Sequence, residues 1–212
     1  MKILEAAAAV SMALWLAATG VAGESRAQGG DGADESREAA ARFAVDTALA
    51  ELLEVLANAG LSGEQRLDAI EKIVRERFDL AVAARLALGK GKNRFSDPQA
   101  ASYACEFEPY LSNSIGSRFD RYHQEKVEIL SAKRSKSHVI VRTRILGGEY
   151  DQAVVDFRMR QSSGQWRAID VTFEGISVVK NLHEQFKEVL SAEGPERLLQ
   201  MLREKNGSRS DC

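Results

Sequence analysis

Residues Asp170 to Phe186 read DVTFEGISVVKNLHEQF, and within them the pattern of a strand changes into that of a helix. Val171 and Phe173 alternate with polar neighbours, as residues on one buried face of a strand do. After Gly175 the apolar residues recur at roughly helical spacing. We therefore expect a strand followed by an amphipathic helix, with Gly175 as the pivot between them.

More strands are predicted upstream, where the apolar residues follow a period of two. The predicted strands contain Val127 and Ile129, then Val139, Val141, Thr143 and Ile145, then Ala153, Val155, Phe157 and Met159, and finally Trp166 to Phe173. Turn residues, Gly147-Gly148 and Ser162-Ser163-Gly164, separate the later strands. Such short connections predict an antiparallel meander.

Helices are predicted on both sides of these strands in the sequence. Their expected ranges are Ser36 to Asn58, Ser62 to Arg77, Asp79 to Leu88, Asp97 to Phe119, Val178 to Leu190 and a last run from Gly194-Pro195 through Leu202. Ser62 with Gln65 forms a capping-box signature, and Asp97-Pro98 is typical of a helix start. Pro109 predicts a kink or a break, because proline lacks the N–H that the helix ladder needs.

The predicted fold class is α+β: a curved antiparallel sheet of about four strands covered by several helices, as in an NTF2-like cone with a helical subdomain. A sheet of this kind leaves room for a conical cavity under its helices. An ordinary packed core is the alternative interpretation of the same apolar residues.

The N-terminus has the features of an export signal. Lys2 precedes an apolar run from Ala6 to Ala22, and Ser25-Arg26-Ala27 suits cleavage after residue 27. An anchoring transmembrane helix is the alternative, because the run is near the required length. We expect residues 1–27 to be a cleaved signal peptide, 28–35 a flexible leader, 36–206 a single soluble domain and 207–212 a disordered tail.

Charge and cysteine content narrow the class of protein further. The chain holds 29 Lys and Arg against 31 Asp and Glu, and this balance argues against a nucleic-acid groove. A locally basic set is interpreted as a solvated sheet edge: Lys126, Lys133, Arg134, Lys136, Arg142 and Arg144. A bridge between Cys105 and Cys212 stays open, but we expect Cys105 to be a small buried residue on a helix.

The sequence lacks the usual signatures of catalysis and of metal binding. His123, His138 and His183 have no metal-ligand spacing, and none lies near a Ser or Cys motif of a triad. A phosphate-binding glycine loop is also missing. We therefore expect no enzyme activity, no catalytic residue, no metal and no cofactor.

Several segments resemble the MlaC, or toluene-tolerance, family of periplasmic phospholipid-binding transport proteins. They are Asp170 to Phe186, Val141-Arg142-Thr143-Arg144, Leu202-Arg203-Glu204-Lys205-Asn206, and Phe107-Glu108-Pro109-Tyr110-Leu111, which is similar to the F-x-P-L-L run of the family. The resemblance covers roughly Phe78 to Asn206. Gly91, Lys92 and Asn93 replace the aromatic pair usual in the family, so contacts made by that loop are in question.

The resemblance implies a periplasmic shuttle that carries phospholipid between the outer and inner membranes. It would act in an Mla-type ABC transport system that maintains outer-membrane lipid asymmetry, without a cofactor. The implied partners are an inner-membrane ABC transporter complex with a lipid-binding ring and an outer-membrane lipoprotein–porin complex.

Inward-facing apolar residues are the candidate lipid contacts. They are Phe107, Leu111 and Ile115 from a helix, Val141, Val155, Phe157, Met159, Val171 and Phe173 from the strands, and Ile176 and Val179 after Gly175. A charged residue at Phe173 is expected to abolish lipid retention. The same change at Trp166, expected on the opposite face, should not affect retention directly.

Three other hypotheses compete with the phospholipid shuttle. A hopanoid-associated branch of the same family would carry a rigid polycyclic lipid. An NTF2-like isomerase would use Asp156 or Asp170 with Tyr103 in an apolar pocket, although alternation places both acids on the outward face. An interaction module would have no internal cavity.

Overall fold

The computed structural model describes residues 31–116 and 125–209. The predicted signal peptide, His123, Phe119 and Cys212 lie outside these ranges. Within them, no helix combines the length and the apolar character of a membrane span. The predicted leader and tail overlap the described part, where residues 31–35 and 207–209 are helical.

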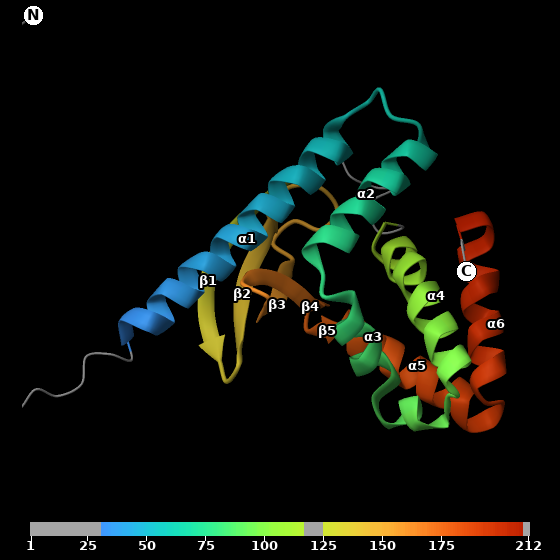
Figure 1. Ribbon diagram of the computed structural model, residues 1–212. Helices are drawn as coiled ribbons and strands as arrows, with labels where there is room; N and C mark the ends of the chain where they lie inside the picture. The colour runs from blue at the N-terminus through green and yellow to red at the C-terminus, as the bar shows by residue number, and fades with distance from the viewer. Residues whose placement is uncertain (1–30, 117–124, 210–212) are drawn as a thin grey trace, which may run out of the picture.

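The architecture is α+β, as predicted from the sequence. The elements in chain order are α1 (Asp31–Ala57), α2 (Gly63–Arg77), α3 (Leu80–Leu88), the 3-10 helix η1 (Gly89–Arg94), α4 (Asp97–Gly116), β1 (Lys126–Ser135), β2 (His138–Leu146), β3 (Val154–Ser162), β4 (Gln165–Phe173), β5 (Ile176–Ser177), α5 (Val178–Ala192), α6 (Pro195–Asn206) and the 3-10 helix η2 (Gly207–Arg209). In Figure 1, α1 crosses over the sheet, while α3, α4, α5 and α6 gather beside it.

The strands form one antiparallel sheet in the order β1-β2-β3-β4-β5, which confirms the predicted meander and adds a short fifth strand. Glu174 and Gly175 have φ values of 47° and 80° and make the turn between β4 and β5. Phe173 pairs with Ile176 across this turn. Gly175 is therefore the corner of a two-residue hairpin rather than a direct pivot from strand to helix.

A β-bulge interrupts the pairing of β3 with β4. Arg158 pairs with Asp170, but the next residue, Met159, pairs with Ala168. Ile169 is the additional residue and is only 1% exposed. Such a bulge reverses the alternation of side chains along the strand.

The bulge changes which residues of β4 share a face. Trp166 and Ala168 now lie on the same side of the sheet as Val171 and Phe173. Trp166 packs against the apolar cluster on that side. The expectation that Trp166 lies on the opposite face from Phe173 is therefore wrong, because simple alternation does not count the extra residue.

Two apolar clusters form the interior. The sheet cluster joins the N-terminal half of α1 to the sheet and consists of Ala41, Val45, Val139, Val141, Met159 and Ala168. The helical cluster joins α2 to α6 and is centred on Phe107 and Phe186, both 0% exposed. Their rings lie 6.5 Å apart at 79°, an edge-to-face contact. The space between these clusters is where the site lies.

Local capping signals behave as the sequence predicts. Ser62 and Gln65 form the reciprocal capping box of α2, and the Asp79 carboxylate accepts from the Val82 N–H at the start of α3. Asp97, at the predicted helix start, is the first residue of α4. Pro109 is accommodated inside α4, so the helix does not break there.

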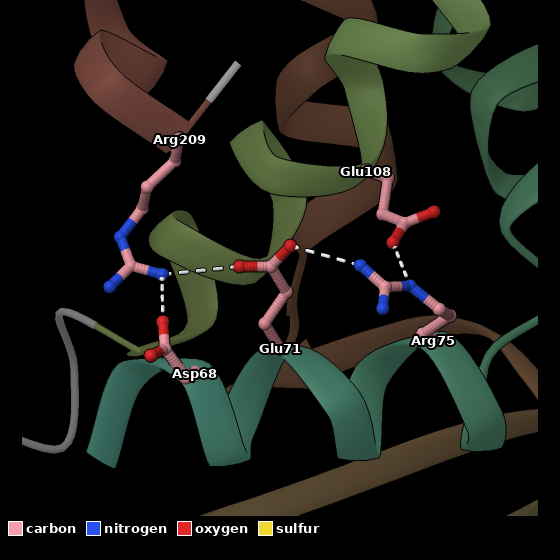
Figure 2. Close-up of polar contacts among 5 residues, drawn as sticks. All are labelled: Asp68, Glu71, Arg75, Glu108 and Arg209. Atoms are coloured by element: carbon pink, nitrogen blue, oxygen red, sulfur yellow. Dashed lines mark hydrogen bonds and ion pairs between the residues drawn. The ribbon is translucent and has the colours of Figure 1, made fainter. Parts of the chain in front are cut away.

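Ion pairs tie α2 to α4 and to the C-terminal end of the described chain (Figure 2). Arg209 contacts Asp68 at 2.9 Å and Glu71 at 3.2 Å. Arg75 contacts Glu71 at 3.1 Å and also pairs with Glu108 of α4. Because α2 is one wall of the site described below, this network fixes that wall to the helical part of the protein.

Cys105 differs from its prediction. The residue is exposed on α4 and is disulfide-bonded, rather than a buried free thiol. The sequence contains a single other cysteine, Cys212.

Truncation of Phe107 tests the assignment of the helical cluster as the structural core. We expect Phe107→Ala to lower the free energy of unfolding by about 3–5 kcal/mol, since it leaves a cavity in a fully buried cluster. The matched control is Phe43→Ala, at a side chain that is 72% exposed, with an expected change within about 0.5 kcal/mol. Urea denaturation followed by circular dichroism measures both, and similar losses would contradict the assignment.

Candidate functional site

A cavity of about 230 Å³ lies between the inner face of the sheet and the helices α1 and α2. Its lining is almost entirely apolar. The lining residues are Ala48, Leu49, Leu52, Leu53 and Leu56 of α1; Ile70, Ile73, Val74 and Arg77 of α2; Phe78; Ile115 of α4; and Glu125, Val127, Thr143, Ile145, Tyr150, Val155, Phe157, Val171 and Phe173 of the sheet and its connections.

The sheet wall consists of side chains in adjacent cross-strand rows. One row contains Thr143, Val155 and Phe173, which pair directly across β2, β3 and β4. The next row contributes Phe157 and Val171. Because side chains of one row stand on the same face of the sheet, this register alone directs them toward the cavity.

The helical wall comes from the leucine-rich C-terminal half of α1 and from α2. Leu49, Leu52, Leu53 and Leu56 recur at three- and four-residue spacing on α1, which directs them to one side of the helix. None of these leucines is among the lipid contacts predicted from the sequence. The available signal was the excess of apolar helix surface over what one small sheet can cover.

The N-terminal half of α1 closes one end of the cavity. Ala41 is 0% exposed within the sheet cluster, and its small side chain lets the helix approach the sheet closely. The Arg42 guanidinium donates to the Ile129 carbonyl at 3.3 Å. Arg134 of β1 pairs with Asp34 at 2.5 Å. The helix is thereby anchored on the sheet at one end and stands away from it along the cavity.

Four lining residues carry polar groups: Thr143, Tyr150, Arg77 and Glu125. The Thr143 hydroxyl donates to the Val155 carbonyl at 2.9 Å, so it offers no free donor to the cavity. Tyr150 stacks edge-to-face on Phe173, with ring centroids 5.4 Å apart. Arg77 pairs with Glu51 of α1.

The fourth polar residue, Glu125, lies against the loop between β2 and β3. A Cβ added at Gly148 would come within 2.0 Å of the Glu125 Oε1 atom. Gly148 also has a φ of 67°, which favours glycine. Glycine at this position therefore makes room for the carboxylate at the rim of the cavity.

Five of the predicted contact residues line this cavity: Ile115, Val155, Phe157, Val171 and Phe173. The other six lie elsewhere. Val141 and Met159 belong to the sheet cluster at its closed end. Phe107, Leu111 and Val179 belong to the helical cluster. Ile176 is 67% exposed at the β4–β5 turn.

Asp170 lies on the face of β4 opposite Val171, as alternation predicts, but it is buried there rather than open to solvent. It is 6% exposed because β5 and α5 cover it. Its carboxylate accepts from the Ser177 hydroxyl at 2.6 Å and from the Val179 N–H at 3.1 Å. Asp170 therefore holds the start of α5 against β4.

The residues considered for an isomerase do not meet in the cavity. Asp156 pairs with Arg142 at 2.7 Å across β2 and β3. The Tyr103 hydroxyl donates to the Ala84 carbonyl at 3.1 Å in the helical cluster, where burial and the neighbouring Tyr110 raise its pKa. Neither these residues nor Asp170 belongs to the lining.

In the part of the chain that the structure describes, no group of three or more His, Cys, Asp or Glu is arranged to hold a metal ion. His183 instead contacts the Ala87 carbonyl through Nδ1 at 3.0 Å. The almost entirely apolar lining suits an apolar ligand.

Comparisons with known proteins agree with this geometry. A family model described as "MlaC protein" matches residues 46–204. Among solved structures, the fold is similar to that of a phospholipid-binding protein from Ralstonia solanacearum, determined in complex with a phospholipid. The chains are 19% identical, with a TM-score of 0.70, and the match covers 79% of this chain and 97% of the other. At this identity the likeness concerns the fold.

Filling the cavity tests whether it admits apolar molecules. We expect Val171→Trp to weaken binding of the fluorescent probe N-phenylnaphthylamine by about tenfold or more, because the indole occupies cavity volume. Val154→Trp is the matched control, since Val154 lies outside the lining. Fluorescence titration measures both, and equal affinity of Val171→Trp and the unaltered protein would mean that the probe binds elsewhere.

Proposed function

Because the chain belongs to the MlaC family, we propose that it is a lipid carrier that holds the acyl chains of a phospholipid in the cavity between α1, α2 and the sheet. The observation that carries this proposal is the lining, which is apolar apart from Thr143, Tyr150, Arg77 and Glu125. The phospholipid bound to the Ralstonia protein of similar fold supports the same ligand class.

Solvation supplies the binding energy in this proposal. Each methylene transferred from water to an apolar cavity contributes roughly 0.8 kcal/mol, so long tails are held without strong polar contacts. The cavity of about 230 Å³ is smaller than the roughly 300–1,000 Å³ usual for ligand pockets. Lipid entry therefore requires the cavity to widen, with α1 moving away from the sheet and from α2.

The transport role extends this proposal to the cell envelope. Cleavage of the predicted signal peptide would release the protein into the periplasm. There it would shuttle phospholipid between an outer-membrane lipoprotein–porin complex and an inner-membrane ABC transporter with a lipid-binding ring. The family membership and the export pattern at Lys2 to Ala27 support this role.

Identification of the bound lipid tests the proposal. We expect protein purified from cells without detergent to carry phospholipid in native mass spectrometry and after organic extraction. Extraction of hopanoids instead would assign the protein to the alternative cargo. Protein that is consistently empty and takes up no lipid from vesicles would contradict the carrier function.

A pair of substitutions locates the lipid. Phe173→Asp is expected to abolish retention, because it places a charge in the apolar lining where the ion loses its hydration. Ile176→Asp is the matched control: the residue pairs with Phe173 across the hairpin but is 67% exposed, so retention should be unchanged. Quantified lipid per protein is the measurement, and loss in both variants would contradict the assigned lining.

A further inference from the structure

Charged groups occupy two places in the cavity lining. Among the described lining residues, Arg77 is the single cation and Glu125 the single anion. Arg77 precedes Phe78, which bridges to Ala168 in β4 beside the sheet cluster. Glu125 precedes β1 and lies against Gly148. The two charges therefore lie toward opposite ends of the sheet wall.

Arg77 is held by Glu51 across the boundary between α1 and α2. Its Nε donates to Glu51 Oε2 at 2.8 Å, and its second guanidinium nitrogen pairs with Oε1. The side chains are 33% and 36% exposed. Both groups are thus reached by solvent while Arg77 also borders the apolar cavity.

We propose that Arg77 is the headgroup contact of the cavity and binds the phosphate of an anionic lipid, displacing Glu51. This inference rests on the proposed function, because it needs the lipid tails in the same cavity. Phosphate oxygens can replace both Glu51 oxygens on the planar guanidinium, which binds such groups bidentately. A partly exposed ion pair contributes little stabilising free energy in water. Replacement of the Glu51 carboxylate by a lipid phosphate therefore costs little free energy.

The charge distribution also orients the lipid. A phosphate at Arg77 is attracted by the guanidinium. The tails then lie beneath α1 and α2, along the rows that contain Phe157 and Val171. Displacement of Glu51 also releases the bond that joins α1 to α2, so headgroup binding and widening of the cavity favour each other.

A competition experiment with matched tails tests this inference. The protein is incubated with vesicles that contain dioleoylphosphatidylglycerol and dioleoylglycerol in equal amounts, re-isolated and extracted, and the two lipids are quantified by mass spectrometry. We expect the unaltered protein to prefer phosphatidylglycerol. Arg77→Gln should lower the ratio by about tenfold or more, the scale of a lost charge-assisted hydrogen bond, while Arg77→Lys keeps part of it.

Two further variants complete the design. Lys72→Gln removes an exposed cation from the same helix and should leave the ratio unchanged. Glu51→Gln frees Arg77 from its partner and should raise the ratio. Excess inorganic phosphate should not displace the phospholipid, because a free phosphate ion has no acyl chains to bind in the cavity. Displacement would mean that Arg77 binds free phosphate, and it would overturn the inference.

The possible failures are distinguishable. If the unaltered protein takes up neither lipid, the carrier function itself fails and this inference with it. If it takes up both, and Arg77→Gln and Glu51→Gln leave the ratio unchanged, the headgroup contact alone is overturned. A third outcome is that Arg77→Gln loses both lipids equally and Glu51→Gln leaves the ratio of phosphatidylglycerol to dioleoylglycerol unchanged. Arg77 would then have a purely structural role, and the inference would be overturned.

Discussion

The position of α1 on the sheet is the constraint on which the cavity depends. Its N-terminal half is fixed by the ion pair of Arg134 with Asp34 and by the close packing of Ala41 against the inner face. A sheet twists along its strands, whereas a long helix only curves gently and does not follow that twist. The C-terminal half of α1 therefore stands off the sheet, and α2 closes the space beside it.

The two sides of the cavity are held with unequal strength. The network around Glu71 and Arg75 fixes α2 to α4 and to Arg209 (Figure 2). The contact of α2 with α1 includes the partly exposed pair of Arg77 with Glu51. Movement of α1 relative to a fixed α2 is thus the least costly way to enlarge the cavity. Because the proposed headgroup binding at Arg77 breaks this ion pair, it would also favour lipid entry.

Sequence patterns predicted the features that local chemistry determines. The capping box at Ser62, the helix start at Asp79 and the strand order follow from residues close together in the chain. The bulge beside Ala168 and the burial of Asp170 did not follow, because each depends on pairing with a distant segment. The same limit applies to the site: strand alternation identified part of the sheet wall, whereas the contribution of α1 and α2 depends on how these helices are placed over it.

The most direct test of the central claim is to locate the acyl chains by isotope-filtered NMR on methyl-labelled protein loaded with phospholipid. The account predicts nuclear Overhauser effects from chain methylenes to the methyl groups of Leu52, Val155 and Val171, which line the cavity. It predicts none to Leu198 and Leu202 of the helical cluster. Contacts confined to the helical cluster, or bound lipid without contacts to α1 and the sheet, would contradict it.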